Sequence, residues 1–600
     1  MNRISRHPTR RMLLAAVVLV ALVGVFVVRL VDIQVVRAAE LSEEAAAVRT
    51  TAPITVYGAR GDIVDANGTV LAGSIMRYDI AVSPKNAGPV DREQPDAADA
   101  SKTTSVEVPL ADVAAELAAV LGMTGDQVIA IIDEALAENP ESDFAYVAKR
   151  VDTATYEKVK ELRIPWVVPW ENPSRMYPNG AVAGNLLGFV GDDGDALAGL
   201  ELSENECLAS ENGEVTYVPS LEDWVEIPGT EIVHSEARDG GTLQLTIDAD
   251  LQWMVQRIAE AQVQAVDADW ATVTVMEAKT GRLLAVADVP TVDPNDPTAT
   301  AKEDRGSRSF TAPFEPGSTF KALTAASVID AGKADPLSEI VTGYQYLPPN
   351  GADITDSFFH EDTRYTLTGV LIDSSNTGMS MFGERLTDQL RFEVMQGFGL
   401  GERTEVGFPA EEPGDLHGGP EEWDNQTKYA TMFGQGLTTT AVQIASAYQT
   451  IANGGVRMPV RLVDGCVGDD GELVAPKSDG ERVISETAAD QTSQMLERVY
   501  LEGWLADEWE IPGYRVAAKT GTAQFPDGQG GYRSEYLVSV SGFAPADDPE
   551  FVVSVSIMNP VKMNSSAASA PVFQEVMSQV LKKYRTVPSG APAPELPATW

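Results

Sequence analysis

Short apolar runs of strand length fall into two groups that lie far apart in the chain. The runs cover residues 273–276, 283–286, 516–523, 536–542 and 551–557. In the last run, Val553, Val555 and Ile557 alternate with a second set of residues that includes two serines, as in an antiparallel strand with one buried face. The region between the two groups shows helical periodicity instead. This order of strands, helices and strands predicts a sheet closed by both chain ends, with a helical lobe inserted.

Two helices carry clear start signals. Thr440 and Gln443 match a capping box, and apolar residues follow at helical spacing until an Asn-Gly-Gly stop. Asp248 is placed to cap a helix over residues 251–266, directly after an alternating run at 243–247 that predicts a strand. These signals predict helices that pack against the sheet.

The first half of the chain shows more mixed patterns. We expect a helical stalk over residues 37–52, a hairpin turn at Asn67-Gly68, and a flexible loop across the polar, proline-bearing residues 88–106. A helix is expected to end at Gly122. Residues 53–235 contain no arrangement of side chains that indicates catalysis.

The N-terminal segment has the length and polarity of a membrane anchor. Arginines at positions 3, 6, 10 and 11 precede an uncharged run over residues 12–28, and apolar character resumes after Arg29. Such a run spans roughly 26 Å as a helix, and a snorkelling Arg29 extends it. The alternative is a signal peptide cleaved near Ala38, but Arg29 and Asp32 lie inside the segment. We expect an uncleaved anchor over residues 12–36 with its arginine-rich end in the cytoplasm.

Composition narrows the class of protein. The chain has 600 residues, too many for one hydrophobic core, so at least two domains are expected. Its net charge of -45 argues against nucleic-acid binding and indicates a solvated acidic surface. The four histidines do not fall at a metal-ligand spacing, so neither a metal nor another cofactor is predicted. Cys207 and Cys466 are expected in different domains; a disulfide between them is possible outside the cell but is not our expectation.

Candidate chemistry begins in the segment that contains Ser318 and Lys321. Pro316-Gly317 followed by helix-forming residues predicts that a helix begins at Ser318, where free N–H groups favour a developing oxyanion. Lys321 lies three residues on, on the same helix face and within reach of the Ser318 hydroxyl. A neutral lysine can accept the serine proton, and burial beside a second cation, here Lys519, would favour neutrality. This serine–lysine spacing also occurs by chance in many chains.

A second polar group, Ser374-Ser375-Asn376, follows the apolar run 367–372 between two expected helices. Ser374 is a candidate to relay a proton to a leaving amine. Asn376 is a candidate to hold a substrate backbone and to contact Lys321. Serine and asparagine are ordinary loop residues, so this group is informative only together with the others.

Two Lys-Thr-Gly triplets must be distinguished. Lys279-Thr280-Gly281 lies between two apolar runs and precedes the serine, so its glycine predicts a hairpin turn. The later triplet, Lys519-Thr520-Gly521, lies inside an expected strand and continues to Thr522. A glycine weakens a strand unless another backbone comes close, and a substrate peptide paired along the strand would supply one. Lys519, Thr520 and Thr522 are then candidates to bind a carboxylate at the substrate's C-terminus.

These three groups, in this order, resemble the signature of the penicillin-binding proteins and class A β-lactamases. The first half of the chain adds detail to the resemblance. The anchor ending in Arg29-Leu30-x-Asp32, and the segments at 59–68, 175–180 and 199–213, are similar to those of class B penicillin-binding proteins. Residues 433–440 and the anchor resemble the division-specific branch more than the elongation branch.

The resemblance implies an α+β fold: a single N-terminal transmembrane helix, a mixed α/β pedestal domain, and a transpeptidase domain with an antiparallel sheet flanked by helices plus an inserted helical lobe. The implied domains begin with a cytoplasmic tail (1–11) and an anchor (12–36). A stalk with a non-catalytic pedestal of the dimerisation type (37–238), a transpeptidase domain (239–585) and a Pro/Ala-rich tail (586–600) follow.

The implied activity is that of a peptidoglycan D,D-transpeptidase. Ser318 would attack the terminal D-Ala-D-Ala bond of a stem peptide, with Lys321 as base and the N–H groups of Ser318 and Thr522 around the oxyanion. β-Lactams would acylate the same serine. A septal glycosyltransferase of the SEDS type and other division proteins are the implied partners.

Four alternatives remain open at this stage. An elongation-type transpeptidase would keep the same chemistry. A β-lactamase would share the serine and lysine but needs a placed water for deacylation. A β-lactam sensor would acylate Ser318 without turnover, yet usually has several membrane helices. A scaffold with a dead site would not need Lys321, Ser374, Asn376 and Lys519 together.

Overall fold

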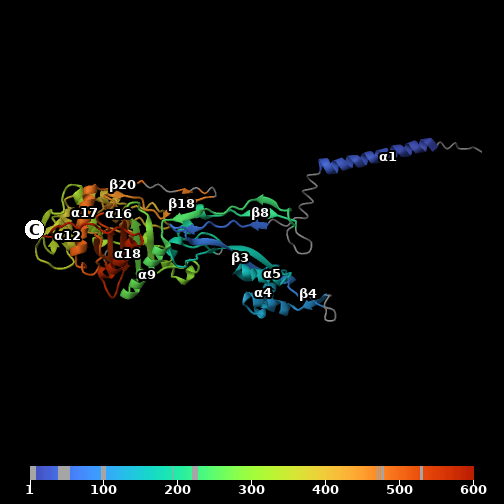
Figure 1. Cartoon of the computed structure of the whole chain (residues 1–600), viewed down its shortest axis with the longest axis horizontal. Coiled ribbons are helices and arrows are strands. Elements are labelled where there is room, and N and C mark those ends of the chain that lie inside the picture. The colour runs from blue at the N-terminus through green and yellow to red at the C-terminus, as the bar shows by residue number, and fades with distance from the viewer. Residues whose placement is uncertain are drawn as a thin grey trace, which may run out of the picture. The chain divides into compact units, whose positions relative to one another are not determined.

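The structure is a computed structural model that describes residues 8–37, 54–95, 103–191, 193–218, 227–468, 471, 473–474, 479–526 and 532–600 (Figure 1). Contacts divide the chain into two compact units. The first comprises residues 1–58 and 210–239, and the second comprises residues 59–209 and 240–600. The expected stalk at 37–52 lies almost entirely outside the described residues.

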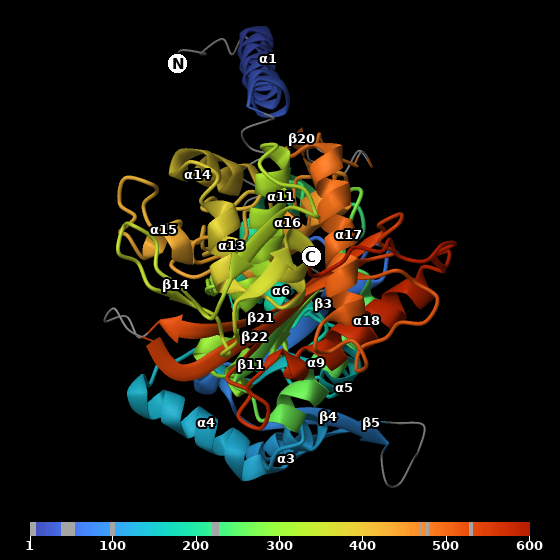
Figure 2. The ribbon, with the colours of Figure 1, turned by 90° about the vertical axis from the view of Figure 1, so that its left-hand side faces the viewer.

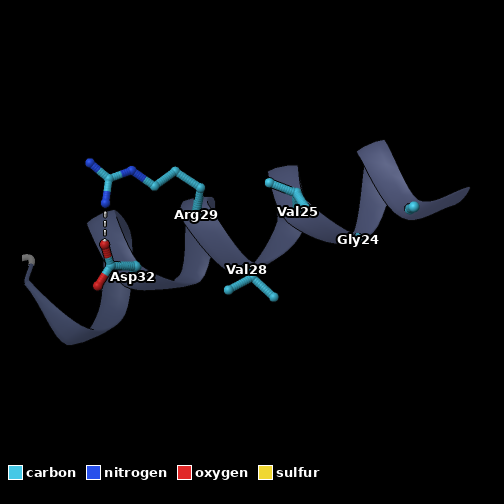
Figure 3. Close-up of a pocket in the computed structure, with 6 residues that line it drawn as sticks. Gly24, Val25, Val28, Arg29 and Asp32 are labelled. Carbon is cyan, nitrogen blue, oxygen red and sulfur yellow. Dashed lines mark hydrogen bonds and ion pairs between the residues drawn. The ribbon is translucent and has the colours of Figure 1, made fainter. Parts of the chain in front are cut away.

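The first unit contains the expected apolar helix. α1 (Pro8–Val31) continues into a π-helical turn, η1 (Asp32–Val36), and the stretch Arg10–Val36 is long and apolar enough to cross a membrane. Arg29 forms an ion pair with Asp32 at 2.7 Å, which lets both charges lie on one side of the helix. Figure 3 shows this pair beside a groove lined by Ala21, Gly24, Val25 and Val28. The same unit holds a three-stranded antiparallel sheet of β1 (Ile54–Val56), β8 (Gly213–Thr216) and β9 (Ile232–Ser235).

The second unit contains two large sheets. The first sheet has the strand order β19-β18-β10-β2-β3-β6, and β7 also pairs with β3. Its strands are β2 (Ile63–Val64), β3 (Val70–Val82), β6 (Ala145–Val151), β7 (Val167–Met176), β10 (Thr242–Leu245), β18 (Val463–Val467) and β19 (Leu473–Val474). The predicted hairpin turn is confirmed, because Gly68 has a φ of 83° between β2 and β3. The helices α3 (Leu110–Leu121), α4 (Gly125–Glu138) and α5 (Thr153–Glu161) share a separate small core with this sheet, and α3 ends at Gly122 as predicted.

The loop prediction for residues 88–106 is wrong at residues 90–95 and 103–106, which are strands, and residues 96–102 lie outside the described residues. β4 (Val90–Pro95) and β5 (Thr103–Val108) pair as an antiparallel ribbon. Arg92 joins the ribbon to α3 through an ion pair with Glu116 at 2.7 Å. Backbone pairing holds this ribbon with little burial, so the residues do not need the apolar alternation that marks a strand in the sequence.

The three N-terminal segments that resemble class B proteins meet at one buried carboxylate. Glu201, on α7 (Gly199–Ser203), is fully buried and accepts from the Nε atoms of Arg60 and Arg175, each at 2.6 Å. The Tyr177 hydroxyl donates to the same carboxylate at 3.2 Å. A buried charge is tolerated when it is paired and hydrogen-bonded in this way, so the cluster explains why these segments contain their charged residues.

Cys207 and Cys466 form a disulfide with a Cα–Cα distance of 6.1 Å, contrary to our expectation. β18 returns after 217 residues of intervening chain (246–462) to pair with β10, and the register places Cys466 opposite Leu243. Cys207 lies on α8 (Asn205–Leu208). Its backbone carbonyl accepts a hydrogen bond from the Gly241 N–H at 2.7 Å. The strand pairing that brings the two sulfurs together is long-range and leaves no local signal in the sequence.

The second sheet is the predicted one, built from strands that precede and follow the inserted helices. Its order is β12-β11-β23-β22-β21, with every pair antiparallel. The strands are β11 (Trp270–Glu277), β12 (Leu283–Val289), β21 (Ala517–Pro526), β22 (Tyr532–Ala544) and β23 (Phe551–Met558). Figure 2 shows α9 (Ala249–Val266) and α18 (Ala570–Lys583) on one side of it and the inserted helices on the other. The predicted α+β class is confirmed.

β23 is buried along its whole length, so the prediction of one exposed face is wrong. Val553, Val555 and Ile557 pack in the core with α9 and α18. The alternate positions, which include Ser554, lie beneath α16. There the Ser554 hydroxyl forms a hydrogen bond with the Ser541 hydroxyl at 2.8 Å. Because the serines bond to each other, a polar face is buried at the centre of the sheet.

The inserted lobe is helical, as predicted. Its helices are α10 (Arg308–Thr311), α11 (Lys321–Asp330), α12 (Leu367–Ile372), α13 (Asn376–Gly383), α14 (Asp388–Gly397), α15 (Thr427–Ala430), α16 (Ala441–Ala452) and α17 (Glu486–Glu502). Short strand pairs, β13 (Glu339–Thr342) with β16 (Thr363–Thr366), β14 (Gln345–Tyr346) with β15 (Ile354–Thr355), and β17 (Val456–Arg457) with β20 (Glu481–Arg482), connect them. The capping box of Thr440 and Gln443 at the start of α16 is confirmed.

Candidate active site

The segment that carries Ser318 begins the first long helix of the lobe. The 3-10 turn η5 (Gly317–Phe320) runs directly into α11, so the predicted helix start is confirmed. Gly317 has a φ of 56°, and a Cβ there would lie 3.1 Å from the Thr522 carbonyl oxygen of β21. The Gly317 N–H donates to the Gly434 carbonyl at 2.9 Å, and a side chain at Gly434 would collide with Gly317. Glycine at both positions therefore permits a backbone path that leaves Ser318 half-buried against the edge strand.

Lys321 is fully buried beneath Ser318. Its Nζ lies 3.1 Å from Ser318 Oγ and 3.3 Å from Ser374 Oγ, and it also donates to the Ser374 carbonyl. Burial lowers the pKa of Lys321 well below its ordinary value, and the charge of Lys519 lowers it further, against an opposing effect of Asp356. The geometry and the electrostatics both favour an amine that is neutral and in contact with the serine hydroxyl.

Ser374 occupies the turn between α12 and α13. Its φ of 55° lies in the left-handed region, which is uncommon for residues other than glycine, asparagine and aspartate. This conformation places Ser374 Oγ between the two lysines, because Lys519 Nζ donates to it at 3.0 Å. The hydroxyl therefore connects both amines to the position beside Ser318.

Lys519 is also fully buried, on the edge strand β21. Burial lowers its pKa to about 7. Besides Ser374, its Nζ contacts the Thr520 carbonyl at 3.2 Å. Thr520 and Thr522 alternate with Gly521 along the strand, so their side chains share one face; Thr520 is buried and Thr522 is exposed.

The glycine at 521 has a reason that differs from the one we expected. A Cβ there would collide with Ser539 Oγ of β22 and would lie 3.1 Å from the Pro316 carbonyl oxygen. The close neighbour is thus the chain's own nucleophile segment, rather than only a substrate peptide. Gly521 permits η5 to approach β21 closely enough for the serine and the strand to border the same space.

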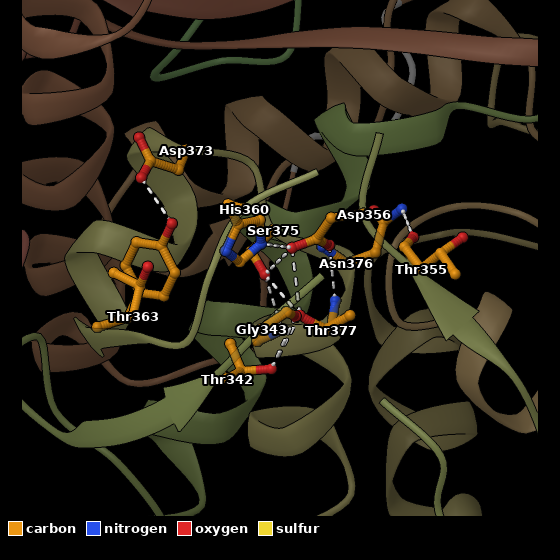
Figure 4. A network of polar contacts seen from close by, with 12 residues as sticks. Thr342, Gly343, Thr355, Asp356, His360, Thr363, Asp373, Ser375, Asn376 and Thr377 are labelled. Atoms are coloured by element: carbon orange, nitrogen blue, oxygen red, sulfur yellow. Dashed lines mark hydrogen bonds and ion pairs between the residues drawn. The ribbon is translucent and has the colours of Figure 1, made fainter. Parts of the chain in front are cut away.

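Asn376 is held by residues that the sequence analysis did not identify. Asp356 accepts from Ser375 Oγ at 2.7 Å, from the Thr377 N–H at 2.9 Å, and from the Asn376 N–H (Figure 4). The Asn376 side-chain amide donates to the Thr355 carbonyl at 3.0 Å, and among the described residues no hydrogen bond joins it to Lys321. The buried Asp356 carboxylate therefore positions the start of α13, and its place in a polar loop 18 residues before Ser374 gives no local sign of this role.

His360 completes this network. Its Nε2 lies 2.9 Å from Asp356 Oδ2, and its Nδ1 lies 2.9 Å from the Glu361 carbonyl (Figure 4). Burial lowers the pKa of His360, but the bonds to Asp356 and to the Glu361 carbonyl outweigh burial and raise it above its ordinary value. Asp356 is therefore bound by His360 on one side and by the backbone N–H groups of Asn376 and Thr377 on the other.

The earlier Lys-Thr-Gly triplet lies apart from these groups. Lys279 sits in the turn between β11 and β12, where Gly281 has a φ of 71°, and its half-exposed side chain lies 3.6 Å from Asp548. The predicted hairpin turn is confirmed. Only the later triplet reaches the space bordered by Ser318.

The fold and this geometry define a class of enzyme: a serine acyl transferase in which a buried lysine contacts a serine at a helix start, against an edge strand that carries a second lysine. Two family models match the chain. The penicillin binding protein transpeptidase domain matches residues 271–578, and the penicillin-binding protein dimerisation domain matches residues 55–223.

Curated relatives agree with these matches. Penicillin-binding protein PbpB of Mycolicibacterium smegmatis is 34% identical over 99% of this chain and 92% of its own length. The peptidoglycan D,D-transpeptidase FtsI of Escherichia coli is 31% identical over 89% of this chain and 85% of its own. The chain belongs to the penicillin-binding protein transpeptidases, and its resemblance to the division-type class B members is confirmed.

Solved structures show the same likeness. A peptidoglycan synthetase from Bifidobacterium adolescentis has a TM-score of 0.70 at 29% identity, covering 92% of this chain and 100% of that chain. Penicillin binding protein 3 from Mycobacterium tuberculosis, complexed with aztreonam, has a TM-score of 0.66 at 27% identity, covering 90% of this chain and 99% of that chain.

Proposed function

We propose that this chain cross-links peptidoglycan through an acyl-enzyme on Ser318, formed at the D-Ala-D-Ala end of a stem peptide. The observation that carries the proposal is the position of Lys321: a fully buried amine 3.1 Å from Ser318 Oγ and beside a second lysine. Burial and the second lysine lower the pKa of Lys321, so its neutral amine can accept the serine proton as the Oγ–carbon bond forms.

The remaining steps follow from the neighbouring groups. The substrate carbonyl oxygen takes up negative charge and is bound by the N–H groups of Ser318 and Thr522. The peptide C–N bond then breaks, and the proton moves from Lys321 through Ser374 to the leaving D-Ala amine. In the second half-reaction the amine of a neighbouring stem attacks the ester carbon, its proton returns by the same path, and Ser318 recovers its hydroxyl.

Substrate binding is assigned to the edge strand and to Asn376. The free edge of β21 can pair with an extended peptide, which Asn376 contacts from the opposite side. Lys519, Thr520 and Thr522 bind the terminal carboxylate, and the carboxylate in turn favours the protonated form of Lys519. A β-lactam presents the same carboxylate and an amide carbonyl, so it acylates Ser318 as a substrate mimic.

Labelling with a fluorescent penicillin tests the nucleophile. Ser318→Ala abolishes labelling, whereas Ser380→Ala, a buried serine on α13, leaves it intact. Product analysis with a D-Ala-D-Ala substrate and an acceptor amine separates the alternatives. Cross-linked product supports the transpeptidase, rapid penicillin hydrolysis supports a β-lactamase, and a stable adduct without turnover supports a sensor.

The proposed cellular role is septal wall synthesis. The arginines that precede the apolar run at residues 12–28 favour a cytoplasmic N-terminus, which leaves the pedestal (37–238) and the transpeptidase domain (239–585) outside the membrane. α1 is the proposed contact with a SEDS-type glycosyltransferase and, through it, with other division proteins. A fluorescent fusion that localises along the lateral wall rather than at the septum would support the elongation branch instead.

A further inference from the structure

The last residues of the Pro/Ala-rich end of the sequence are docked on the helical lobe. Residues Leu596–Trp600, here called the strap, lie along β16. The Thr366 N–H donates to the Ala598 carbonyl at 3.0 Å, and Thr599 forms an antiparallel bridge with Tyr365. The Trp600 N–H donates to the Arg364 carbonyl at 3.3 Å. The strap thus adds a short antiparallel strand to β16.

Helix α12 is shaped to receive the strap. Thr366 caps α12: its hydroxyl accepts from the Gly369 N–H at 3.0 Å and donates to the Pro597 carbonyl at 2.6 Å. A side chain at Gly369 would collide with the Ala598 carbonyl oxygen. Glycine inside a helix is less favourable than alanine, so the close approach of the strap explains its presence here.

Side-chain contacts hold the two ends of the strap. The Arg364 guanidinium lies 5.0 Å from the centre of the Trp600 ring, within the range of a cation–π interaction, and the indole N–H lies 3.4 Å from the Ile340 carbonyl. At the other end, Leu596 and Ala598 are partly buried against the main core. The strap is therefore bound through backbone, apolar and aromatic contacts together.

The strap is close to the catalytic turn. Tyr365, which lies between the two residues that bind the strap, is buried, and its hydroxyl donates to Asp373 Oδ2 at 2.8 Å. Asp373 directly precedes Ser374, the residue with the left-handed backbone. The six-residue helix α12 thus connects the strap at its first turn to Ser374 just past its last.

We infer that the strap is a positioning element for Ser374. By holding β16 and the first turn of α12, it keeps the Ser374 hydroxyl between Lys321 and Lys519 without touching the reacting atoms. The inference rests on the proposed acylation of Ser318. It requires the strap to act on the chemical step, in which Ser374 relays a proton, and to leave binding along β21 unchanged.

The test uses the full chain and a fluorescent penicillin, with the acylation rate constant and the dissociation constant measured separately. Gly369→Ala blocks the dock, and deletion of residues 596–600 removes the strap; Gly590→Ala, at an open exposed position, is the matched control. Both test variants are expected to lose about tenfold or more in rate constant, since small displacements of a catalytic group cost up to about 10²-fold. The dissociation constant and the control are expected to stay at the parent value.

Rescue separates positioning from folding. The peptide Leu-Pro-Ala-Thr-Trp, added to the deletion variant, is expected to restore the rate constant up to a plateau as the peptide concentration rises. The same peptide is expected to have no effect on Gly369→Ala, because the added methyl group blocks the docking position. If the deletion variant does not fold, Trp600→Ala gives the same readout with a smaller loss.

Two results would overturn the inference. One is an unchanged rate constant in folded Gly369→Ala and Trp600→Ala. The other is a loss that follows the unfolded fraction and does not respond to the peptide. A parent protein that is not labelled at Ser318 would instead refute the proposed function.

Discussion

Replacing Lys519 with methionine is expected to raise the pH at which Ser318 becomes reactive. The Nζ atoms of Lys321 and Lys519 lie 3.3 and 3.0 Å from Ser374 Oγ, so they are at most about 6 Å apart. Two unit charges at about 6 Å repel by about 3 kcal/mol at an effective dielectric constant of about 20, which is about two pH units. Methionine removes this repulsion, so the pKa of Lys321 rises, although burial still holds it below its ordinary value.

The assay is the second-order rate constant for acylation by a fluorescent penicillin between about pH 5 and pH 10. Acylation needs neutral Lys321, so the acidic limb of the profile moves to higher pH, by up to about two units. In the parent, Lys519 has a pKa of about 7 and loses its charge as pH rises through that value, so carboxylate binding weakens on the alkaline side. That alkaline loss is expected to disappear in the variant.

The matched control is Lys279→Met, which alters the lysine of the other Lys-Thr-Gly triplet. Its side chain is 53% exposed in the turn between β11 and β12, and its profile is expected to match the parent's. The maximum rate constant of Lys519→Met falls, because the carboxylate of the penicillin loses a binding partner. The coupling of the two lysines is therefore judged from the pH at which the acidic limb lies, and not from the maximum rate constant. An acidic limb that stays in place or moves to lower pH would refute the proposed coupling of the two lysines.

Three further changes have defined outcomes. In the parent, the Asp356 carboxylate holds the start of α13 and raises the pKa of Lys321. Asp356→Asn removes this charge, so the pKa of Lys321 falls. We expect slower acylation and an acidic limb shifted to lower pH, opposite to Lys519→Met. Cys207→Ser opens a loop of 259 residues, so denaturant unfolding should show a loss of up to about 5 kcal/mol, and the parent with reductant should match the variant. Gly521→Ala would place a Cβ 3.1 Å from the Pro316 carbonyl oxygen and 3.1 Å from Thr319 Cγ2, so η5 is displaced and penicillin labelling should slow; labelling at the parent rate would contradict the reason given for this glycine.

Sequence reasoning succeeded where the determining contacts are short-range. The helix start at Ser318, the position of Lys321 one turn later and the turn at Lys279-Thr280-Gly281 all depend on residues within about four positions of each other. The strands of the catalytic sheet were also predictable, because alternation and apolar runs are local. Their joining into one sheet followed from the order of elements along the chain.

The missed features all depend on distant contacts. Asp356 reaches Ser375 and Thr377 through a fold of the loop, and Asp373 is tied to the strap through Tyr365. β23 has serines that look exposed, but they are covered because helices pack on both faces of the sheet. The ribbon at β4 and β5 is held by pairing rather than burial. Residue spacing and composition contain no information on such contacts.

The bridge between Cys207 and Cys466 also determines how the protein responds to mechanical force. It links α8 covalently to β18, the strand that returns from the catalytic lobe. If a partner pulls on the segment before Cys207 while the wall resists through the substrate groove, tension passes through a covalent bond. The hydrogen bonds between β10 and β18 are then shielded from shear, and the sheet does not unzip at that edge.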